Sequence, residues 1–352
     1  GDESLFQASA RRFLGKGFGD PLVVTNDSFR FIVTEQLDAA GVAPSGIVIE
    51  PDGRNTAPAA ILAALKVQQD TPGGMLLLVP SDHAVANSAA FRKAVMAGAA
   101  SAEEGNIVTF GIKATRPETG FGWLQSGAET HKGVMKLERF IEKPDAARAV
   151  ELLADPKYLW NAGVFLARAD VLIDAFRTHA PDILAGVEAA LAGAISDLDF
   201  TRLDEAAWAG VPEESIDYAV MEKATNVSVV SFDEQWSDLG SWESVWQEST
   251  KDKNGNARSE NTTVFDCENT LLRSESSEIE LVGIGLKNVV AVAMRDAVMV
   301  ADLSESQNVK KAVETLKKRG AKQAVQLPVD HRPWGWFETL ILADRFQVKR
   351  IH

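Results

Sequence analysis

The feature that most constrains the fold is a regular alternation of short apolar segments with helical segments in the first third of the chain. Strands are predicted at 21–26, 45–51, 74–83 and 107–112, with a helical segment between each pair. The first of these helices is closed by Gly41, a residue type favoured at helix C-termini. Continuously apolar strands that alternate with helices are typical of a parallel sheet covered by helices on both faces. The sequence therefore predicts an α/β fold, in which ligands bind beyond the carboxyl ends of the strands.

The overall charge and the cysteine content argue against several classes of protein. The 352 residues include 36 Lys and Arg against 50 Asp and Glu, a formal net charge of −14. General nucleic-acid binders and binders of anionic membranes use a basic face, so we expect neither kind of partner. Cys267 is the only cysteine, which leaves no disulfide framework and no cysteine-based metal cluster. No apolar run approaches the ~18 residues of a membrane helix, and no signal-peptide pattern is present, so the sequence predicts a cytoplasmic protein.

The segment EPDGRNTAP (residues 50–58) follows the second predicted strand and carries residue types that a purine nucleotide needs. Glu50 is a strand-end carboxylate, and one carboxylate can accept both donors, N1–H and the N2 amino group, of a guanine base. The backbone amides of Asn55, Thr56 and Ala57 are expected at a helix N-terminus, where free N–H groups favour an acceptor or an anion. An ordinary helix start with Asn55 or Thr56 as N-cap explains the same residues and is, by itself, the simpler interpretation.

Two acidic residues far apart in the sequence are candidates for a metal site. Asp82 follows the apolar run 75–79, and Asp238 lies in the Trp-rich turn WSDLGSW. A strand-end Asp is well placed to hold Mg²⁺, because this ion binds one or two carboxylates together with phosphate oxygens. The sequence predicts that the two carboxylates share one divalent ion. The alternative is that each residue only stabilises its local turn.

Three further segments carry groups suited to a hydroxyl-rich ligand. Gly120 and Gly122 form a Gly-x-Gly turn that lets the backbone approach a ligand closely, although a plain hairpin turn explains it as well. In the other two segments, the adjacent Glu142 and Lys143 end a predicted strand, and Asn161 and Gly163 precede an apolar one.

The sequence closely resembles bacterial mannose-1-phosphate guanylyltransferases in eight segments that occur in the same order: SLFQ, EPDGRNTAPAA, LVPSDH, TFGIKATRPETGFGW, FIEKPD, WNAGVF, SIDYAVMEK and WSDLGSW. The resemblance covers about residues 1–250 and continues to residue 320. It implies a Rossmann-like, glycosyltransferase-A-like fold with a mixed, mostly parallel sheet and helices on both faces. It also implies a Mg²⁺-dependent reaction in which GTP and mannose 1-phosphate give GDP-mannose and pyrophosphate.

The same resemblance implies a role for each candidate residue. Asp82, Asp238 and Lys143 would be catalytic, the first two as metal ligands and the third beside the sugar phosphate. Asp217, in SIDYAVMEK, is expected to support the site structurally. The guanine would be held by Glu50, Arg54, Asn55, Thr56 and Ala57. The mannose would be held by Gly120, Gly122, Glu142, Asn161 and Gly163.

Four parts of the chain follow from the resemblance: a nucleotidyltransferase domain (1–250), a linker (251–261), a short left-handed β-helix-like domain with a terminal helix (262–325) and the start of a cupin-type isomerase domain (326–352). In the family the β-helix often packs against a neighbouring subunit, which implies a homodimer. The family's first strand and glycine-rich phosphate loop are absent from this sequence, and the isomerase part stops before its metal-binding histidines. A chain of these residues alone is therefore expected to be inactive.

Two alternatives fit the same pattern. A related pyrophosphorylase would use another base or another sugar 1-phosphate. Glu50 favours guanine over uracil or thymine, because those bases present one imino donor flanked by carbonyl acceptors that would repel a carboxylate. A nucleotide-binding module without catalytic activity would fit the absent phosphate loop.

Overall fold

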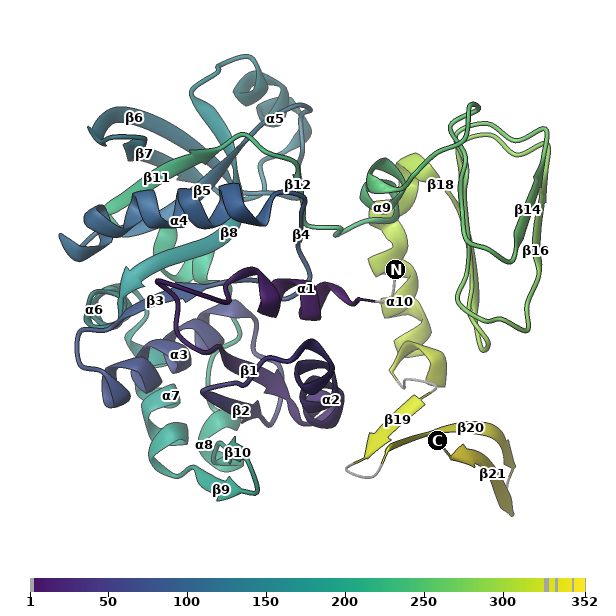
Figure 1. The fold of residues 1–352 in the computed structure, drawn as a ribbon, viewed down its shortest axis with the longest axis horizontal. Coiled ribbons are helices and arrows are strands. Elements are labelled where there is room, and N and C mark those ends of the chain that lie inside the picture. Colours follow the sequence, from purple (N-terminus) through teal and green to yellow (C-terminus); the bar gives the residue numbers. More distant parts are fainter. Residues whose placement is uncertain (1–2, 326–328, 333–334, 344, 352) are drawn as a thin grey trace. The chain divides into compact units, whose positions relative to one another are not determined.

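A computed structural model of the protein describes residues 3–325, 329–332, 335–343 and 345–351. The chain forms two compact units, Gly1–Trp236 and Ser237–His352 (Figure 1). The predicted isomerase segment 326–352 lies partly outside the described residues.

The first unit alternates strands and helices in the predicted order (Figure 1). The expected C-cap at Gly41 is confirmed: its φ of 67° is left-handed, and its N–H donates to the carbonyl of Asp38. The strands are β1 (Leu22–Asn26), β2 (Gly46–Glu50), β3 (Met75–Leu78), β4 (Ala84–Val85), β5 (Ile107–Lys113), β6 (Trp123–His131), β7 (Val134–Ile141), β8 (Tyr158–Arg168), β9 (Ile195–Asp197), β10 (Phe200–Arg202) and β11 (Val227–Phe232). The helices are α1 (Leu5–Arg12), α2 (Arg30–Ala40), α3 (Thr56–Asp70), α4 (Ser88–Glu103), α5 (Ala146–Leu153), α6 (Ala169–His179), α7 (Pro181–Ala192) and α8 (Glu205–Ala209), with one π-helix at Asp217–Met221.

All of these strands except β4 form two mixed sheets, one with the order β1-β2-β10-β9 and one with the order β3-β8-β5-β11-β7-β6. Parallel pairing joins β1 to β2, β2 to β10 and β5 to β11. The mixed α/β character agrees with the prediction, but antiparallel pairs outnumber parallel ones among the described strands. The reason is that β8 runs antiparallel to β3, β5 and β6. Apolar periodicity identifies a buried strand but carries no information about its direction.

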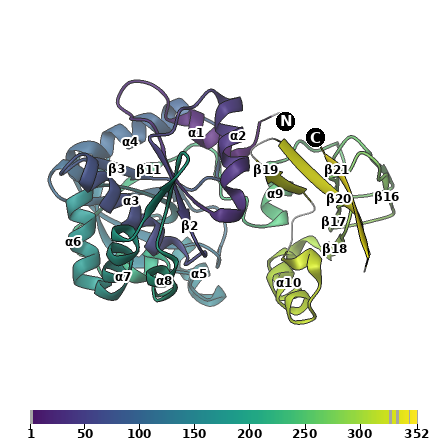
Figure 2. The same ribbon diagram turned by 90° about the horizontal axis from the view of Figure 1, so that it is seen from below.

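Helices cover both faces of the six-stranded sheet. On one face α4 packs Phe91, Val95 and Ala102 against β5, β8 and β11. On the other face α3, α6 and α7 form a separate core that includes Phe176 and Ile61. Figure 2 shows α4 and α7 on opposite sides of the strands. The predicted covering of the sheet on both faces is therefore observed.

The two sheets leave a cavity between β1 and β3. Among the described strands, β1 pairs with β2 alone and β3 with β8 alone, so each has one edge without a partner strand. Both edges line a cavity of about 840 Å³, together with side chains of α1, α3 and α4. A free strand edge offers unpaired N–H and C=O groups to a further strand. The edges of β1 and β3 that line the cavity are therefore open to further backbone pairing.

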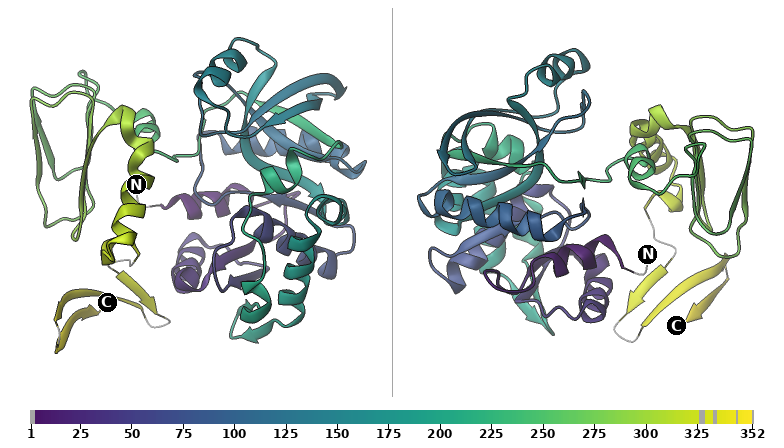
Figure 3. Two further views of the ribbon diagram at one scale, coloured as in Figure 1. Left: turned by 180° about the vertical axis from the view of Figure 1, so that it is seen from behind. Right: turned by 45° about the horizontal axis from the view of Figure 1, so that its top comes forward.

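The second unit is built mainly of parallel ladders, which Figure 3 shows as stacked loops of chain. One ladder has the order β13-β15-β17-β18 and the other pairs β14 with β16; all of these pairs are parallel except β17–β18. An antiparallel sheet of three strands follows. The strands are β13 (Ala257–Arg258), β14 (Thr262–Phe265), β15 (Leu271–Ser274), β16 (Leu281–Ile284), β17 (Val289–Ala293), β18 (Val298–Asp302), β19 (Val329–Arg332), β20 (Gly335–Ala343) and β21 (Phe346–Ile351); the helices are α9 (Trp242–Glu248) and α10 (Val309–Lys318).

The division between the units falls before α9, whereas the sequence places the first domain boundary near residue 250. Helix α9 packs Trp242, Val245 and Trp246 against the core of the second unit, which includes Leu271 and Val290. Its apolar face is therefore buried by residues that follow it in the chain. None of the described helices combines the length and apolar character that crossing a bilayer requires.

Candidate active site

The carboxylate of Glu50 is buried at the carboxyl end of β2. Glu50 is 8% exposed, and among the described residues its Oε1 has no hydrogen-bond partner. Burial raises its pKa to about 7, because an ionised carboxylate is poorly solvated there. A buried polar atom without a hydrogen-bond partner lowers the stability of the folded protein by roughly 1–3 kcal/mol, unless a ligand or a water molecule supplies the missing hydrogen bond. The group is therefore positioned to accept hydrogen bonds from a bound molecule.

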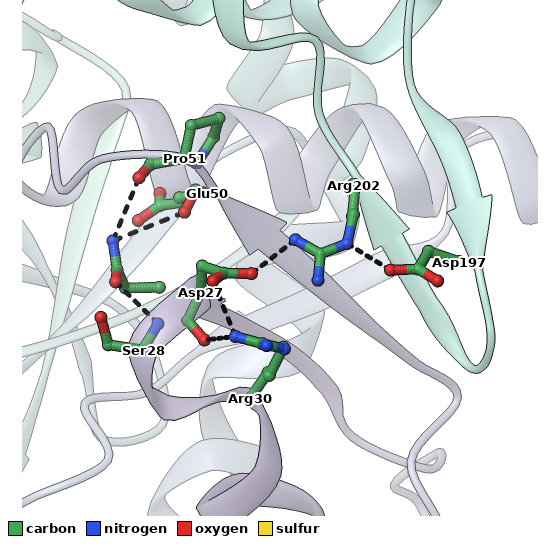
Figure 4. A network of polar contacts seen from close by, with 8 residues as sticks. Asp27, Ser28, Arg30, Glu50, Pro51, Asp197 and Arg202 are labelled. Atoms are coloured by element: carbon green, nitrogen blue, oxygen red, sulfur yellow. Dashed lines mark hydrogen bonds and ion pairs between the residues drawn. The ribbon is translucent and has the colours of Figure 1, made fainter. Parts of the chain in front are cut away.

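Ion pairs brace the strand ends around Glu50 (Figure 4). Arg202 of β10 binds Asp197 (2.6 Å) and Asp27, and Asp27 also pairs with Arg30 at 2.7 Å. These contacts join the end of β1 to the β9–β10 hairpin. They hold in place the strand ends beside which Glu50 lies.

Two long-range contacts tether the loop that follows Glu50. The indole Nε1 of Trp208, a fully buried residue, donates to the carbonyl of Asp52 at 2.7 Å. The guanidinium of Arg54 donates to the carbonyls of Val211 (3.2 Å) and Ala209 (3.1 Å). Arg54, which the resemblance places at the guanine, thus binds the end of α8 and holds the loop in shape.

The start of α3 is an ordinary capped helix start, which was the alternative to the predicted free amides. Asn55 is the N-cap, with φ 66°, and its side chain accepts a hydrogen bond from the N–H of Thr56 at 2.9 Å. The N–H of Ala57 donates to the carbonyl of Glu214 at 3.1 Å, and Pro58 has no N–H. The expectation of free amides at Thr56 and Ala57 is wrong, because the chain itself binds both. Asn55 and Thr56 still line the cavity between β1 and β3.

A second group of predicted residues lies together around β8. Gly122 packs so closely that a Cβ there would lie 2.7 Å from Glu142 Oε2 and 3.2 Å from Asn161 Cβ. The N–H of Asn161 donates to the carbonyl of Gly122 at 2.8 Å, and Lys143 Nζ lies 2.9 Å from Glu142 Oε1. Gly163 (φ 65°) donates to the side chain of Asn161 at 3.1 Å. The structure therefore brings these five residues into one cluster.

Gly120 stands apart from this cluster. It is exposed in the preceding turn, and its N–H donates to Glu118 at 2.9 Å. Of the two glycines only Gly122 is closely packed, and its neighbours are protein side chains, so the close approach of the turn to a ligand stays a prediction.

The segment 214–217 connects the two groups of residues. Its Ile216 N–H donates to the Thr56 hydroxyl at 3.0 Å, next to the contact between Ala57 and Glu214. One residue later, Asp217 accepts a hydrogen bond from the Asn161 amide at 3.0 Å. Burial raises the pKa of Asp217 to about 7, and the charge of Glu142 adds to the rise. The predicted supporting role of Asp217 has a geometric basis here.

The two predicted metal ligands belong to different units. Asp82 is exposed in the turn between β3 and β4. Asp238 lies in the second unit, where its Oδ1 accepts a hydrogen bond from the N–H of Gly240 at 3.0 Å. In the described part of the chain, no group of three or more His, Cys, Asp or Glu side chains could hold a metal. Mg²⁺ does not require such a group, because phosphates and water supply most of its ligands. Carboxylate oxygens such as those of Asp82 and Asp238 are of the type that Mg²⁺ prefers.

Comparison with known proteins identifies the family. Residues 1–255 match the nucleotidyl transferase family. The chain belongs to this family. It is 44% identical over 351 residues to the xanthan biosynthesis protein XanB of Xanthomonas campestris pv. campestris (strain B100), and 40% identical over 357 residues to the mannose-1-phosphate guanylyltransferase ManC of Salmonella typhimurium (strain LT2). Both alignments cover the whole of this chain and 74% of the relative. A crystal structure from Thermus thermophilus, described as a mannose-1-phosphate geranyltransferase, matches with a TM-score of 0.73 at 29% identity and covers 89% of both chains.

Some residues that shape the site of this nucleotidyl transferase were missed by the sequence analysis. Glu222 accepts a hydrogen bond from the backbone N–H of Glu142 at 3.0 Å. Glu214 and Ile216 bind the start of α3, and Trp208 fixes the loop before it. The segment SIDYAVMEK contained the signal for Glu222, since it carries a second carboxylate beyond Asp217. The backbone contacts of Glu214 and Ile216 have no signal in side-chain chemistry.

The raised pKa of Glu50 predicts a specific pH dependence of stability. Because this pKa is about 7 in the folded protein against 4.5 as the usual value, the folded state binds more protons between these limits and becomes less stable as the pH rises through them. The difference corresponds to about 3 kcal/mol. We expect Glu50→Gln to remove this part of the decline in unfolding free energy, measured by urea titration from pH 4 to pH 8. The exposed Glu188→Gln is the control; a Glu50→Gln curve parallel to the wild type would contradict the assignment.

Proposed function

We propose that the protein transfers GMP from GTP to mannose 1-phosphate, forming GDP-mannose and releasing pyrophosphate. The proposal is supported by relatives such as ManC, which carries the name mannose-1-phosphate guanylyltransferase. The observation that carries it is the buried carboxylate of Glu50, whose Oε1 has no partner among the described residues. No other base offers two adjacent donors in the way that guanine does on its N1 and N2 edge.

In this proposal the base and the sugar occupy the two groups of residues joined by the segment 214–217. Guanine donates to Glu50, and Asn55 and Thr56 form the start of α3 that follows. The mannose hydroxyls donate to Glu142 and contact Asn161, and the backbone of Gly122 and Gly163 allows close approach. Lys143 is half-exposed beside Glu142, which leaves its ammonium group accessible to the sugar phosphate.

The reaction needs positioning more than covalent help from the protein. A phosphate oxygen of mannose 1-phosphate attacks the α-phosphorus of GTP, and the bond to the β-phosphate oxygen breaks, so that pyrophosphate leaves with the electron pair. When the protein holds the two substrates in line, the reaction between them becomes effectively unimolecular, which lowers its entropic barrier. The charge of Lys143 offsets the negative charge of the attacking phosphate.

Nucleotidyl transferases generally use divalent metal ions. For this protein we propose Mg²⁺, with Asp82 and Asp238 as its carboxylate ligands. A bound Mg²⁺ would polarise the phosphate oxygens and neutralise their charge.

As protein partner we propose a second copy of the chain, bound through β14 and β16. Phe265 and Ile284 are register partners on these strands and are 55% and 69% exposed, and Val282 on the same ladder is 53% exposed. Exposed apolar side chains gathered on one face mark interaction surfaces.

Sedimentation equilibrium should find a dimer that Phe265→Asp dissociates; a wild-type monomer would contradict this interface.

The role of Glu50 in selecting guanine predicts a nucleotide-specific defect. Glu50→Gln replaces one acceptor by a donor that faces the N2 amino group. We expect kcat/KM for GTP to fall about 10- to 100-fold, measured in the complete natural protein that carries these residues, while its stability at pH 7 is retained. ATP, CTP and UTP serve as internal controls. An equal loss with all four nucleotides would remove the base-reading role.

The metal proposal predicts that both carboxylates are needed for turnover. We expect Asp82→Ala and Asp238→Ala each to abolish Mg²⁺-dependent formation of GDP-mannose, because either change removes a metal ligand. Asp233→Ala removes an exposed carboxylate just after β11 and should retain activity. Full activity of the Asp238→Ala protein would exclude Asp238 as a ligand.

A further inference from the structure

The sugar half of the proposed site holds two carboxylates around one ammonium group. The Glu142 side chain is only 5% exposed and pairs directly with Lys143 at 2.9 Å. Asp217 joins this group through Asn161, whose amide donates to it at 3.0 Å and which packs with Glu142 against Gly122. Lys143 is held in a left-handed backbone conformation with φ 44°, and its N–H donates to Phe121 at 3.2 Å. A non-glycine residue adopts this conformation only when its surroundings enforce it.

Asp217 owes its position to a π-helix. The N–H of Glu222 donates to the carbonyl of Asp217 at 3.0 Å, five residues back, and the Glu222 side chain accepts from the N–H of Glu142. Single π-turns are rare and frequently occur at functional sites. Here the wider turn directs Asp217 to Asn161 and directs Glu222 to the backbone beside Lys143. The cluster is thus fixed from both sides.

We propose that Asp217 is a positioning residue that takes up one proton when the sugar phosphate binds beside Lys143. This inference rests on the proposed function, which places a phosphate at Lys143. A phosphate there adds negative charge to two carboxylates that share one ammonium group. Glu142 keeps its direct pair with Lys143, whereas Asp217 is bonded to the neutral Asn161 amide. A protonated Asp217 can still accept that bond at Oδ1 and carry its proton on Oδ2.

The titration range of Asp217 suits this role. Burial, followed by the charge of Glu142, raises its pKa to about 7, while Lys143 and Asn161 oppose the rise. The other titratable groups nearby are Tyr218 on the same element, which acts on Lys143, Glu222, whose side chain binds the N–H of Glu142, and His83, which lines the same cavity as Asp217. When the phosphate binds, the pKa of Asp217 rises further, so a proton is taken up above pH 7. Below about pH 6 the group is already protonated and uptake disappears.

Isothermal titration of the complete natural protein with mannose 1-phosphate tests the proposal. Titrations at pH 7.5 in buffers of different ionisation enthalpy give the number of protons bound. We expect uptake of about 0.5–0.8 proton for the wild type at this pH, and none at pH 5.5 that is attributable to Asp217. The second ionisation of a phosphate monoester lies near pH 6, so at pH 7.5 the ligand contributes little.

Asp217→Asn should abolish the uptake while keeping the acceptor for Asn161, so the sugar phosphate still binds. Glu222→Gln is the matched control: it removes an exposed charge at the C-cap of the same π-helix and keeps the acceptor for the Glu142 N–H, so uptake should persist. Equal uptake in the wild type and in Asp217→Asn would overturn the assignment, as would binding without any uptake. Failure of the wild type to bind mannose 1-phosphate at all would instead overturn the proposed function.

Discussion

The site depends on the way in which the segment 214–217 satisfies polar groups of two distant parts of the first unit. Its backbone accepts from Ala57 and donates to Thr56 at the start of α3, and its Asp217 accepts from Asn161 on β8. Buried backbone groups must find partners, so these contacts fix where the loop after β2 lies relative to β8. The carbonyl of Glu214 also occupies the N–H of Ala57, and the side chain of Asn55 occupies that of Thr56, so neither amide is free to bind a ligand.

Two carboxyl groups of this region have pKa values raised to about 7, Asp217 in the segment itself and Glu50 at the end of β2, and their surroundings differ. Burial alone raises the pKa of Glu50, whose Oε1 lacks a partner among the described residues. Asp217 is buried too, but a neighbouring carboxylate, an ammonium group and an amide also act on it. Buried titratable groups cost stability and are concentrated at functional sites. A carboxylate that lacks a hydrogen-bond partner, such as Glu50, is suited to bind donors of a ligand. A carboxylate that interacts with other charged and polar groups, such as Asp217, is suited to take up a proton when the charge beside it changes.

Much of the fold, and part of the site, could be predicted because their signals are local. Alternating apolar segments located the strands, glycine marked the end of α2, and Asn55 was recognised as a possible cap. The clustering of Gly122, Glu142 and Asn161 was implied by the resemblance to the family. Non-local contacts could not be predicted: Arg54 binds carbonyls after α8, and Ala57 binds the carbonyl of Glu214. Strand direction was also beyond reach, since β8 has the apolar pattern of a parallel strand but pairs antiparallel.

A crystal structure of the complete natural protein with GDP-mannose would test the central claim most directly, namely that one site joins a guanine-reading carboxylate to a sugar cluster through the segment 214–217. The account predicts that N1 and N2 of the guanine lie within hydrogen-bond distance of Glu50, and that mannose hydroxyls contact Glu142 and Asn161. A guanine bound elsewhere, with the Glu50 carboxylate contacting only protein or water, would contradict it.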